Sequence, residues 1–187
     1  MPQQQLDPHM WEIDKLFENK VYNVPVYQRP YSWNSDNVET LLNDIYEAYC
    51  SSDKYEGYYT GNLLLHDKNE RINGIATVYE VIDGQQRITT ISLMLLALYS
   101  IVTLRGGQDD DVYRDLKKLL WKKITKRQPE KEYKVVNLNS TEKKCFDDLC
   151  NNNTLVNGSK IFPKDTILLK IDKLHKGYYK LRRLLKV

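Results

Sequence analysis

The spacing of apolar residues predicts two amphipathic helices near the start of the chain. Asp7 and Pro8 favour a helix start, and the apolar residues that follow them on one side predict a helix over 6–17. Over 38–49 apolar residues recur every three to four positions, which predicts a second helix with Ser35 as its cap.

Three runs, residues 21–26, 58–66 and 78–82, have the composition of strands. Pro25 cannot donate a hydrogen bond to a neighbouring strand, so residues 21–26 are predicted to form an edge strand or an extended entry. The other two runs flank a polar, hairpin-like turn and are predicted to pair with each other, the first with Gly61 inside it.

The longest apolar run, residues 88–104, contains no charged residue. A membrane span needs roughly 20 predominantly apolar residues. This run is interrupted by the hydroxyl residues Thr89, Thr90, Ser92, Ser100 and Thr103. We therefore predict a core helix packed on all sides, not a membrane segment. No basic segment followed by an apolar run opens the chain, so no signal peptide is expected.

The remainder of the chain is predicted to be mainly helical. An amphipathic helix is expected over 108–124, with acidic residues first and lysines last, as the helix dipole favours. A brief strand over 132–139, a short helix from Ser140 and a basic helix over 165–187 are expected to follow. The last helix reaches Val187 without a capping glycine, so we expect the natural fold to continue or to pair with another chain.

Charge divides the chain into two halves. Residues 1–104 hold 7 Lys and Arg against 14 Asp and Glu, whereas residues 105–187 hold 21 against 11. This asymmetry predicts two units, a domain over 1–105 and a basic, mainly helical region over 106–187. The basic region either binds a polyanion or is a solvated helical surface, and its charge alone favours neither.

The DNA-binding interpretation depends on lysines of the predicted helix and its end. The proposed contacts are Lys118, Lys122, Lys123 and Lys126. At helical spacing Lys118 and Lys122 share a face, and so do Lys122 and Lys126. Such lysines would contact phosphates without reading bases, and their affinity for DNA would fall steeply with salt.

The three cysteines, Cys50, Cys145 and Cys150, are odd in number and lack a CxxC spacing. This pattern argues against a disulfide framework and against a zinc site. A reducing compartment fits it best, so we expect a cytoplasmic protein.

A polar cluster, Asp83-Gly84-Gln85-Gln86-Arg87, stands where a predicted strand meets the apolar helix. The first turn of a helix leaves N–H groups unpaired and carries partial positive charge, which favours an anion. Gly84 permits a sharp turn, and Arg87 is a cation suited to phosphate. These are parts of a phosphate-handling site. The plainer interpretation makes Asp83 a helix cap and Arg87 its ion-pair partner, but it leaves the two glutamines unexplained.

A second polar cluster, YQRPYSW, covers residues 27–33. Arg29 precedes Pro30, which places a cation on a stiffened, extended backbone. Aromatic rings in the same stretch offer faces on which a base or a guanidinium can stack. These rings belong to Tyr27, Tyr31 and Trp33. The loop would add a second arginine and a stacking surface to the first cluster.

Together these motifs resemble the N-terminal domain of GmrSD-type restriction proteins. The stretches VPVYQRPYSW, VETLLNDI, YYTGNLLL and YEVIDGQQRITTISLMLLAL follow one another in the order and spacing of that domain. The likeness is close over about residues 10–105 and looser beyond. Gln28 and Arg29 match the family's YQR motif, and residues 83–87 match its DGQQR motif.

The resemblance implies an α+β fold of the ParB/sulfiredoxin type, with a small mixed sheet and packed helices. It also implies a module that binds and hydrolyses a nucleoside triphosphate, GTP or ATP, in bacterial systems that restrict foreign DNA. Such proteins commonly carry a C-terminal HNH-type nuclease domain. Here the histidines, His9, His66 and His175, are scattered, so we expect the nuclease on a longer parent or a partner subunit.

By this resemblance and the residue chemistry, the two motifs form one nucleotide site. Its expected binding residues are Gln28, Arg29, Tyr31, Trp33, Gly84 and Arg87. The helix N-terminus would hold phosphate oxygens, and Arg29 and Arg87 would neutralise charge that develops in the transition state. Tyr31 or Trp33 would stack on the base.

The expected catalytic residues are Asp83, Gln85, Gln86 and Arg87. Asp83 would bind a magnesium ion or position the attacking water, which Gln85 or Gln86 would orient. Asp44 and Glu80 stay open as other carboxylates for this task. The alternative functions are a non-catalytic, ParB-like DNA-binding module and a degenerate fragment of structural value only.

Overall fold

The computed structural model describes residues 7–51, 57–72, 74–104, 111–125, 128–138, 143–144 and 185–186. Its helices are α1 (Ile13–Phe17), α2 (Ser35–Cys50), α3 (Gln85–Leu104) and α4 (Asp111–Leu120). Its strands are β1 (Lys20–Val24), β2 (Tyr58–Tyr59), β3 (Leu64–Ile72), β4 (Ala76–Asp83), β5 (Trp121–Thr125), β6 (Gln128–Lys134), β7 (Val136–Leu138) and β8 (Leu185–Lys186). The α+β class and the small mixed sheet are as predicted.

A four-stranded sheet in the order β3-β4-β1-β7 forms one side of the fold. β1 runs parallel to both of its neighbours, and β3 is antiparallel to β4. β1 is therefore an interior strand, and the prediction of an edge strand is wrong. Pro25 lies just after the strand instead of inside it, so every β1 amide remains free to pair, and Val21, Tyr22 and Val24 are buried.

The polar stretch between β3 and β4 is not a long turn. β3 continues to Ile72 and β4 begins at Ala76, so the turn itself is confined to residues 73–75. β3 tolerates this polar sequence because it is the edge strand of its sheet and most of its residues are exposed. The pairing also shifts register between Asp67 and Arg71, where Asn69 has a positive φ of 55°.

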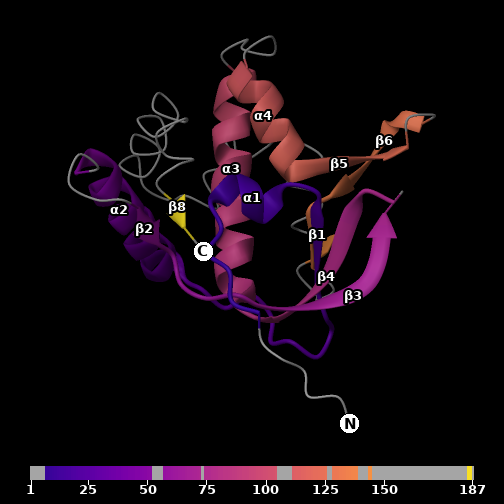
Figure 1. The fold of residues 1–187 in the computed structure, drawn as a ribbon. Helices are drawn as coiled ribbons and strands as arrows, with labels where there is room; N and C mark the ends of the chain where they lie inside the picture. Colours follow the sequence, from indigo (N-terminus) through magenta and orange to yellow (C-terminus); the bar gives the residue numbers. More distant parts are fainter. Residues whose placement is uncertain are drawn as a thin grey trace.

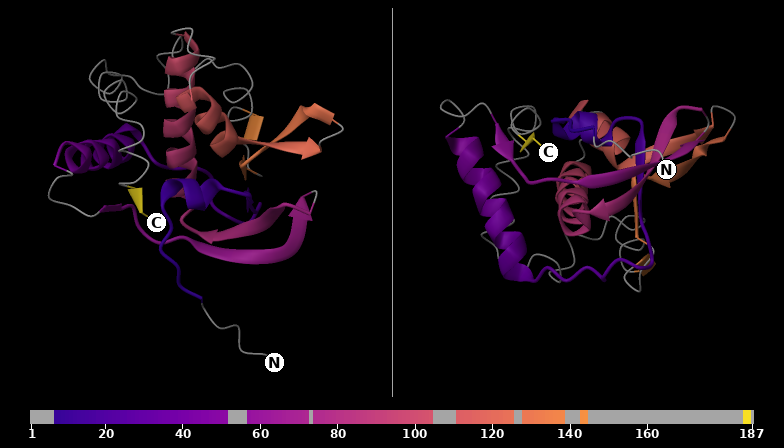
Figure 2. Two further views of the ribbon diagram at one scale, coloured as in Figure 1. Left: turned by 45° about the horizontal axis from the view of Figure 1, so that its top comes forward. Right: turned by 60° about the horizontal axis from the view of Figure 1, so that its bottom comes forward.

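Helix α3 runs through the centre of the molecule, between α2 on one side and the sheet on the other (Figures 1 and 2). It begins at Gln85, three residues earlier than predicted, and ends at Leu104 as predicted. By length and composition this helix could cross a membrane, but 83% of its most apolar window is buried inside the protein. That burial is the expected property of a core helix.

Helix α4 packs beside α3 and ends at Leu120, so the prediction of one helix over 108–124 is wrong. Leu116, Leu119 and Leu120 complete the buried side of α4. The carbonyl of Leu120 then accepts a hydrogen bond from the amide of Val135 at 2.9 Å. The residues after Leu120 pair with β6 in the β5–β6 hairpin instead of continuing the helix. The helical spacing of the lysines does not predict this pairing.

The predicted DNA-contacting lysines are divided by the end of α4. Lys118 lies in the helix, Lys122 and Lys123 lie in β5, and Lys126 lies outside the described residues. The prediction that Lys118 and Lys122 share a helical face is therefore wrong, and the contact of all four with DNA stays a prediction.

The sheet and the core both continue past residue 105. β7 pairs with β1, and the buried leucines of α4 belong to the same core cluster as α1, α2 and α3. The boundary predicted between 105 and 106 thus lies within one sheet and one core. Residues 185–186 pair in parallel with β2 as strand β8, where a helix over 165–187 was predicted. The rest of that helix, and most of the helix from Ser140, lie outside the described residues.

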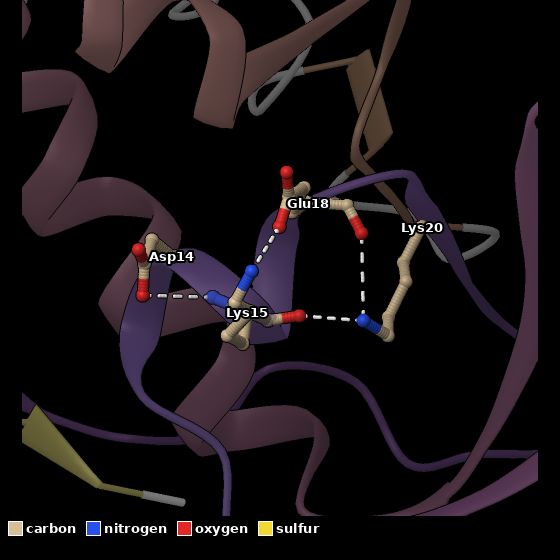
Figure 3. Close-up of polar contacts among 4 residues, drawn as sticks. All are labelled: Asp14, Lys15, Glu18 and Lys20. Carbon is tan, nitrogen blue, oxygen red and sulfur yellow. Dashed lines mark hydrogen bonds and ion pairs between the residues drawn. The ribbon is translucent and has the colours of Figure 1, made fainter.

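Helix α1 begins at Ile13, so the predicted start at Asp7 and Pro8 is wrong. The carboxylate of Asp7 instead contacts His9 at 3.0 Å. At the other end of α1, Nζ of Lys20 donates to the carbonyl oxygens of Lys15 and Glu18, at 2.5 and 3.4 Å (Figure 3). This contact satisfies carbonyls that a helix end leaves unpaired. Burial lowers the pKa of Lys20.

Two further features confirm and adjust the predicted α2. Its apolar spacing forms a helix as predicted, with Leu41, Leu42 and Ile45 buried. Its cap, however, is Asn34, one residue before the predicted Ser35. The side chain of Asn34 accepts from the Asn37 amide at 3.0 Å, and the side chain of Asn37 returns the contact at 3.2 Å.

Candidate functional site

The two polar clusters meet at one edge of the sheet. The loop over 25–34 follows β1, and the segment 83–87 follows β4. Because β1 and β4 are adjacent and parallel, their carboxyl ends lie at the same edge. The side chain of Gln28 donates to the carbonyl oxygen of Ile82 at 2.7 Å, which joins the two segments directly.

Gln86 ties its helix to the loop through hydrogen bonds to backbone atoms. Its Nε2 donates to the carbonyl oxygen of Pro30 at 3.1 Å. Its Oε1 accepts from the amides of Ser32 at 2.9 Å and of Trp33 at 3.3 Å. The side chain is only 6% exposed. All three bonds go to protein, and the role of orienting a water stays a prediction.

Gln85 holds the loop one residue earlier. Its Nε2 donates to the carbonyl oxygen of Arg29 at 2.5 Å, and the side chain is 8% exposed. The backbone of Arg29 is therefore fixed beside the start of α3, while the Arg29 side chain is exposed.

Tyr31 and Trp33, predicted to stack on a base, are both half-buried. The hydroxyl of Tyr31 lies 2.8 Å from Oγ1 of Thr90, and burial raises the pKa of Tyr31. Trp33 packs against the core cluster. Tyr27, by contrast, is 67% exposed. Sequence reasoning did not select Tyr27 over the other two rings, because nothing in the loop sequence shows which rings turn inward.

Asp83 and Arg29 are the charged groups at this edge that remain available. Asp83 is the last residue of β4, and its side chain is exposed. Within the described part of the chain neither residue makes an ion pair, and no hydrogen bond or ion pair joins Asp83 to Arg87. The plainer interpretation, in which Asp83 and Arg87 are structural partners, therefore finds no support in this geometry.

Arg87 is half-buried and contacts a segment that sequence reasoning did not include in the site. Its Nη1 donates to the carbonyl oxygen of Asn62. A Cβ added to Gly61 would lie 2.9 Å from Cζ of Arg87, so the guanidinium rests directly on the Gly61 backbone. The signal was present in the sequence as a glycine inside an apparent strand, which often marks close approach of another group.

Gly84 forms the turn between β4 and α3. Its φ is +89°, and a Cβ there would lie 2.3 Å from Cδ2 of Leu63 and 3.0 Å from the Asn62 carbonyl oxygen. Only glycine adopts this conformation without strain and leaves room for the 61–63 segment. The turn places the start of α3 at the sheet edge that carries Asp83 and the backbone of Arg29, and the first-turn amides of a helix favour an anion.

The other two carboxylates considered for the site have partners of their own. Asp44 accepts a hydrogen bond from the hydroxyl of Tyr58 at 3.1 Å, and Glu80 lies 3.9 Å from Nζ of Lys68. Burial and the neighbouring Asp44 raise the pKa of Tyr58 to about 12. Among the described residues, the Asp83 side chain has no such hydrogen bond or ion pair.

Asp83 is the side chain at this edge that could take part in a magnesium site. The described residues contain no group of three or more His, Cys, Asp or Glu side chains that could hold a metal on their own. Magnesium usually keeps several waters and takes one or two carboxylates plus substrate phosphates. Asp83, an exposed carboxylate beside a helix start, fits that limited role.

Comparison with protein-family models identifies a match. The family model described as GmrSD restriction endonuclease, N-terminal domain, matches residues 13–185. The matched span contains both polar clusters, the four helices of the described residues and their four-stranded sheet. A search of curated proteins found no match.

Proposed function

Because the chain belongs to the family of GmrSD restriction endonuclease N-terminal domains, we propose that it is the nucleotide-binding and nucleotide-hydrolysing module of its restriction system. One observation carries the proposal. Hydrogen bonds between two distant segments hold Arg29, Asp83 and the first turn of α3 at the same edge of the sheet. A cation, an exposed carboxylate and a helix start together suit a phosphate ester.

In the proposed complex, phosphate oxygens lie at the first-turn amides of α3 and contact the guanidinium of Arg29. Arg87 uses one N–H on the Asn62 carbonyl and offers its others to the phosphates. The exposed ring of Tyr27 stands one residue before Gln28, whose side chain is anchored, and is the best-placed ring for the base. Stacking on a ring does not distinguish guanine from adenine, so the proposal includes both GTP and ATP as substrates.

Hydrolysis is assigned to Asp83. Its carboxylate would position or deprotonate the water that attacks the terminal phosphate, and the two arginines would neutralise the charge that develops on the phosphate oxygens. A magnesium ion bound with the nucleotide would be held on the protein side by Asp83, and would shield the phosphate charge. Hydrolysis would in turn gate a nuclease on a partner subunit or on another domain of the same protein.

Replacing Arg29 by alanine tests the binding part of the proposal. Isothermal titration of Arg29→Ala with GTP and with ATP should show an affinity loss of roughly tenfold to hundredfold for the preferred nucleotide, because a charge-assisted contact to phosphate is lost. The Arg29 side chain makes no ion pair among described residues, so stability should not change.

Arg71→Ala is the matched control. Arg71 is an exposed arginine on β3 whose ion pair with Asp67 spans 3.3 Å. The control removes the same charge at another place and should leave nucleotide affinity unchanged. Equal affinities in the wild type, Arg29→Ala and Arg71→Ala would remove the proposed site.

The second candidate function, DNA binding, is favoured by the β5–β6 hairpin. The hairpin extends from the end of α4 away from α3 (Figures 1 and 2). Residues 121–134 hold six Lys and Arg against two Glu. A two-stranded ribbon can enter the major groove of DNA, and lysines on it would contact phosphates. This hairpin replaces the predicted lysine helix as the candidate DNA contact.

Salt dependence tests this candidate. Binding of duplex DNA, followed by fluorescence anisotropy, should weaken with salt at a log–log slope of roughly −0.9 per phosphate neutralised. The double variant Lys122→Gln, Lys123→Gln should make the slope shallower by up to about two units, whereas Lys68→Gln on β3 should not change it. An affinity that stays flat as salt rises would exclude the hairpin as a DNA contact.

A further inference from the structure

The side chains of Gln85 and Gln86 are buried and form hydrogen bonds to backbone atoms of the loop over 28–33. The side-chain amide of Gln86 makes three of the four hydrogen bonds open to it, one donated and two accepted, all to the backbone of residues 30–33. Its 6% exposure leaves little surface for a ligand or a water. A side chain used in this way joins two pieces of backbone.

Side chains from both segments take part in these hydrogen bonds. Gln85 donates to the carbonyl oxygen of Arg29 at 2.5 Å, and Gln28, from the loop, donates back to the carbonyl oxygen of Ile82 at 2.7 Å. Tyr31 adds a contact to Thr90 at 2.8 Å, and Thr90 in turn donates to the carbonyl oxygen of Gln86. The loop after β1 and the start of α3 are thereby bound to each other at several successive residues.

We propose that Gln85 and Gln86 are positioning residues, which clamp the loop over 28–33 onto α3 and so fix the backbone from which the Arg29 side chain reaches the nucleotide. This inference rests on the proposed nucleotide site, and it replaces the prediction that one glutamine orients the attacking water. Glutamine suits the task because its amide both donates and accepts. A glutamate in place of Gln86 could still accept from the loop amides but could not donate to Pro30.

Hydrogen exchange measures the clamp without any nucleotide. The amides of Ser32 and Trp33 donate to Gln86, so in Gln86→Met, which is similar in size but offers no comparable partner, their exchange should quicken by roughly tenfold or more. In Gln86→Glu the exchange rates of these two amides should lie between those in Gln86→Met and in the wild type. This variant replaces Gln86→Met in the test if Gln86→Met does not fold. Ser100→Ala is the control, since Ser100 is buried on the same helix and its hydroxyl donates to the carbonyl oxygen of Leu96, far from the loop. It should leave loop exchange unchanged.

Nucleotide titration then tests positioning. Gln86→Met should weaken nucleotide binding by roughly tenfold, because the loop must be ordered before Arg29 can make its contact. In an Arg29→Ala background the same substitution should have little further effect, since the two residues act on one contact.

The outcomes separate this inference from the proposed function. Faster loop exchange with unchanged affinity would reduce the glutamines to structural residues and overturn the positioning role. Unchanged exchange and affinity with a large loss of turnover would restore the water-orienting role and overturn the clamp. If the wild type binds no nucleotide, the proposed function fails and positioning fails with it, while the exchange data still decide whether the clamp exists.

Discussion

Asp83→Asn should lower nucleotide turnover by about 100-fold to 10,000-fold, the usual contribution of a positioned acid or base. The substitution keeps the shape of the side chain and removes its charge and basicity. Because Asp83 is exposed and makes no ion pair within the described part of the chain, stability should stay within about 0.5 kcal/mol of the wild type. Turnover is measured by phosphate release, and stability by urea unfolding.

Glu70→Gln supplies the matched control for this prediction. Glu70 is an exposed carboxylate on β3, so its loss changes the net charge by the same amount without altering the sheet edge of the site. Turnover by this control should equal that of the wild type. If Asp83→Asn instead unfolds more easily and keeps its turnover, Asp83 is a structural residue and the catalytic assignment is wrong.

Gly84→Ala should be the most destabilising single-methyl change at this site. The φ of +89° is strained for any residue with a Cβ, at about 1–2 kcal/mol. The added methyl group would also overlap Leu63 and the Asn62 carbonyl oxygen, and overpacking of this kind costs about 1–3 kcal/mol. Together these effects should lower the free energy of unfolding by about 2–5 kcal/mol, measured by urea denaturation.

Gly74→Ala separates the two causes. Gly74 also has a positive φ, of 70°, but a Cβ there meets nothing within 4 Å. Its substitution should therefore cost only the backbone strain, about 1–2 kcal/mol. If both substitutions lower the free energy of unfolding equally, the close approach of the 61–63 segment to Gly84 does not contribute to the loss of stability.

Regular patterns in the sequence predicted the interior of this fold well. The uncharged run after Arg87 predicted the buried helix α3, and the spacing of Leu41, Leu42 and Ile45 predicted the buried face of α2. The YQR and DGQQR stretches were predicted to form one site from their chemistry and from the family resemblance. The two helices, by contrast, were predicted from local periodicity, which the sequence displays directly.

The errors occurred where a tertiary contact decides the local structure. The polar residues of β3 form a strand because an edge position tolerates them, and β1 is interior because β7, far away in sequence, pairs with it. Periodicity within one segment contains no information on such partners. The same limit applies to the hydrogen-bond partners of Gln86, which lie 53–56 residues away along the chain and could not be predicted from the sequence around it.

The most direct test of the nucleotide site is a crystal structure of the chain with magnesium and a non-hydrolysable GTP or ATP analogue. The account predicts terminal phosphates at the first-turn amides of α3, in contact with the guanidinium of Arg29, with Asp83 next to the metal. It also predicts that the hydrogen bonds of Gln85 and Gln86 to the loop remain unchanged. Nucleotide bound elsewhere, or absent at saturating concentration while the protein is folded, would contradict the account.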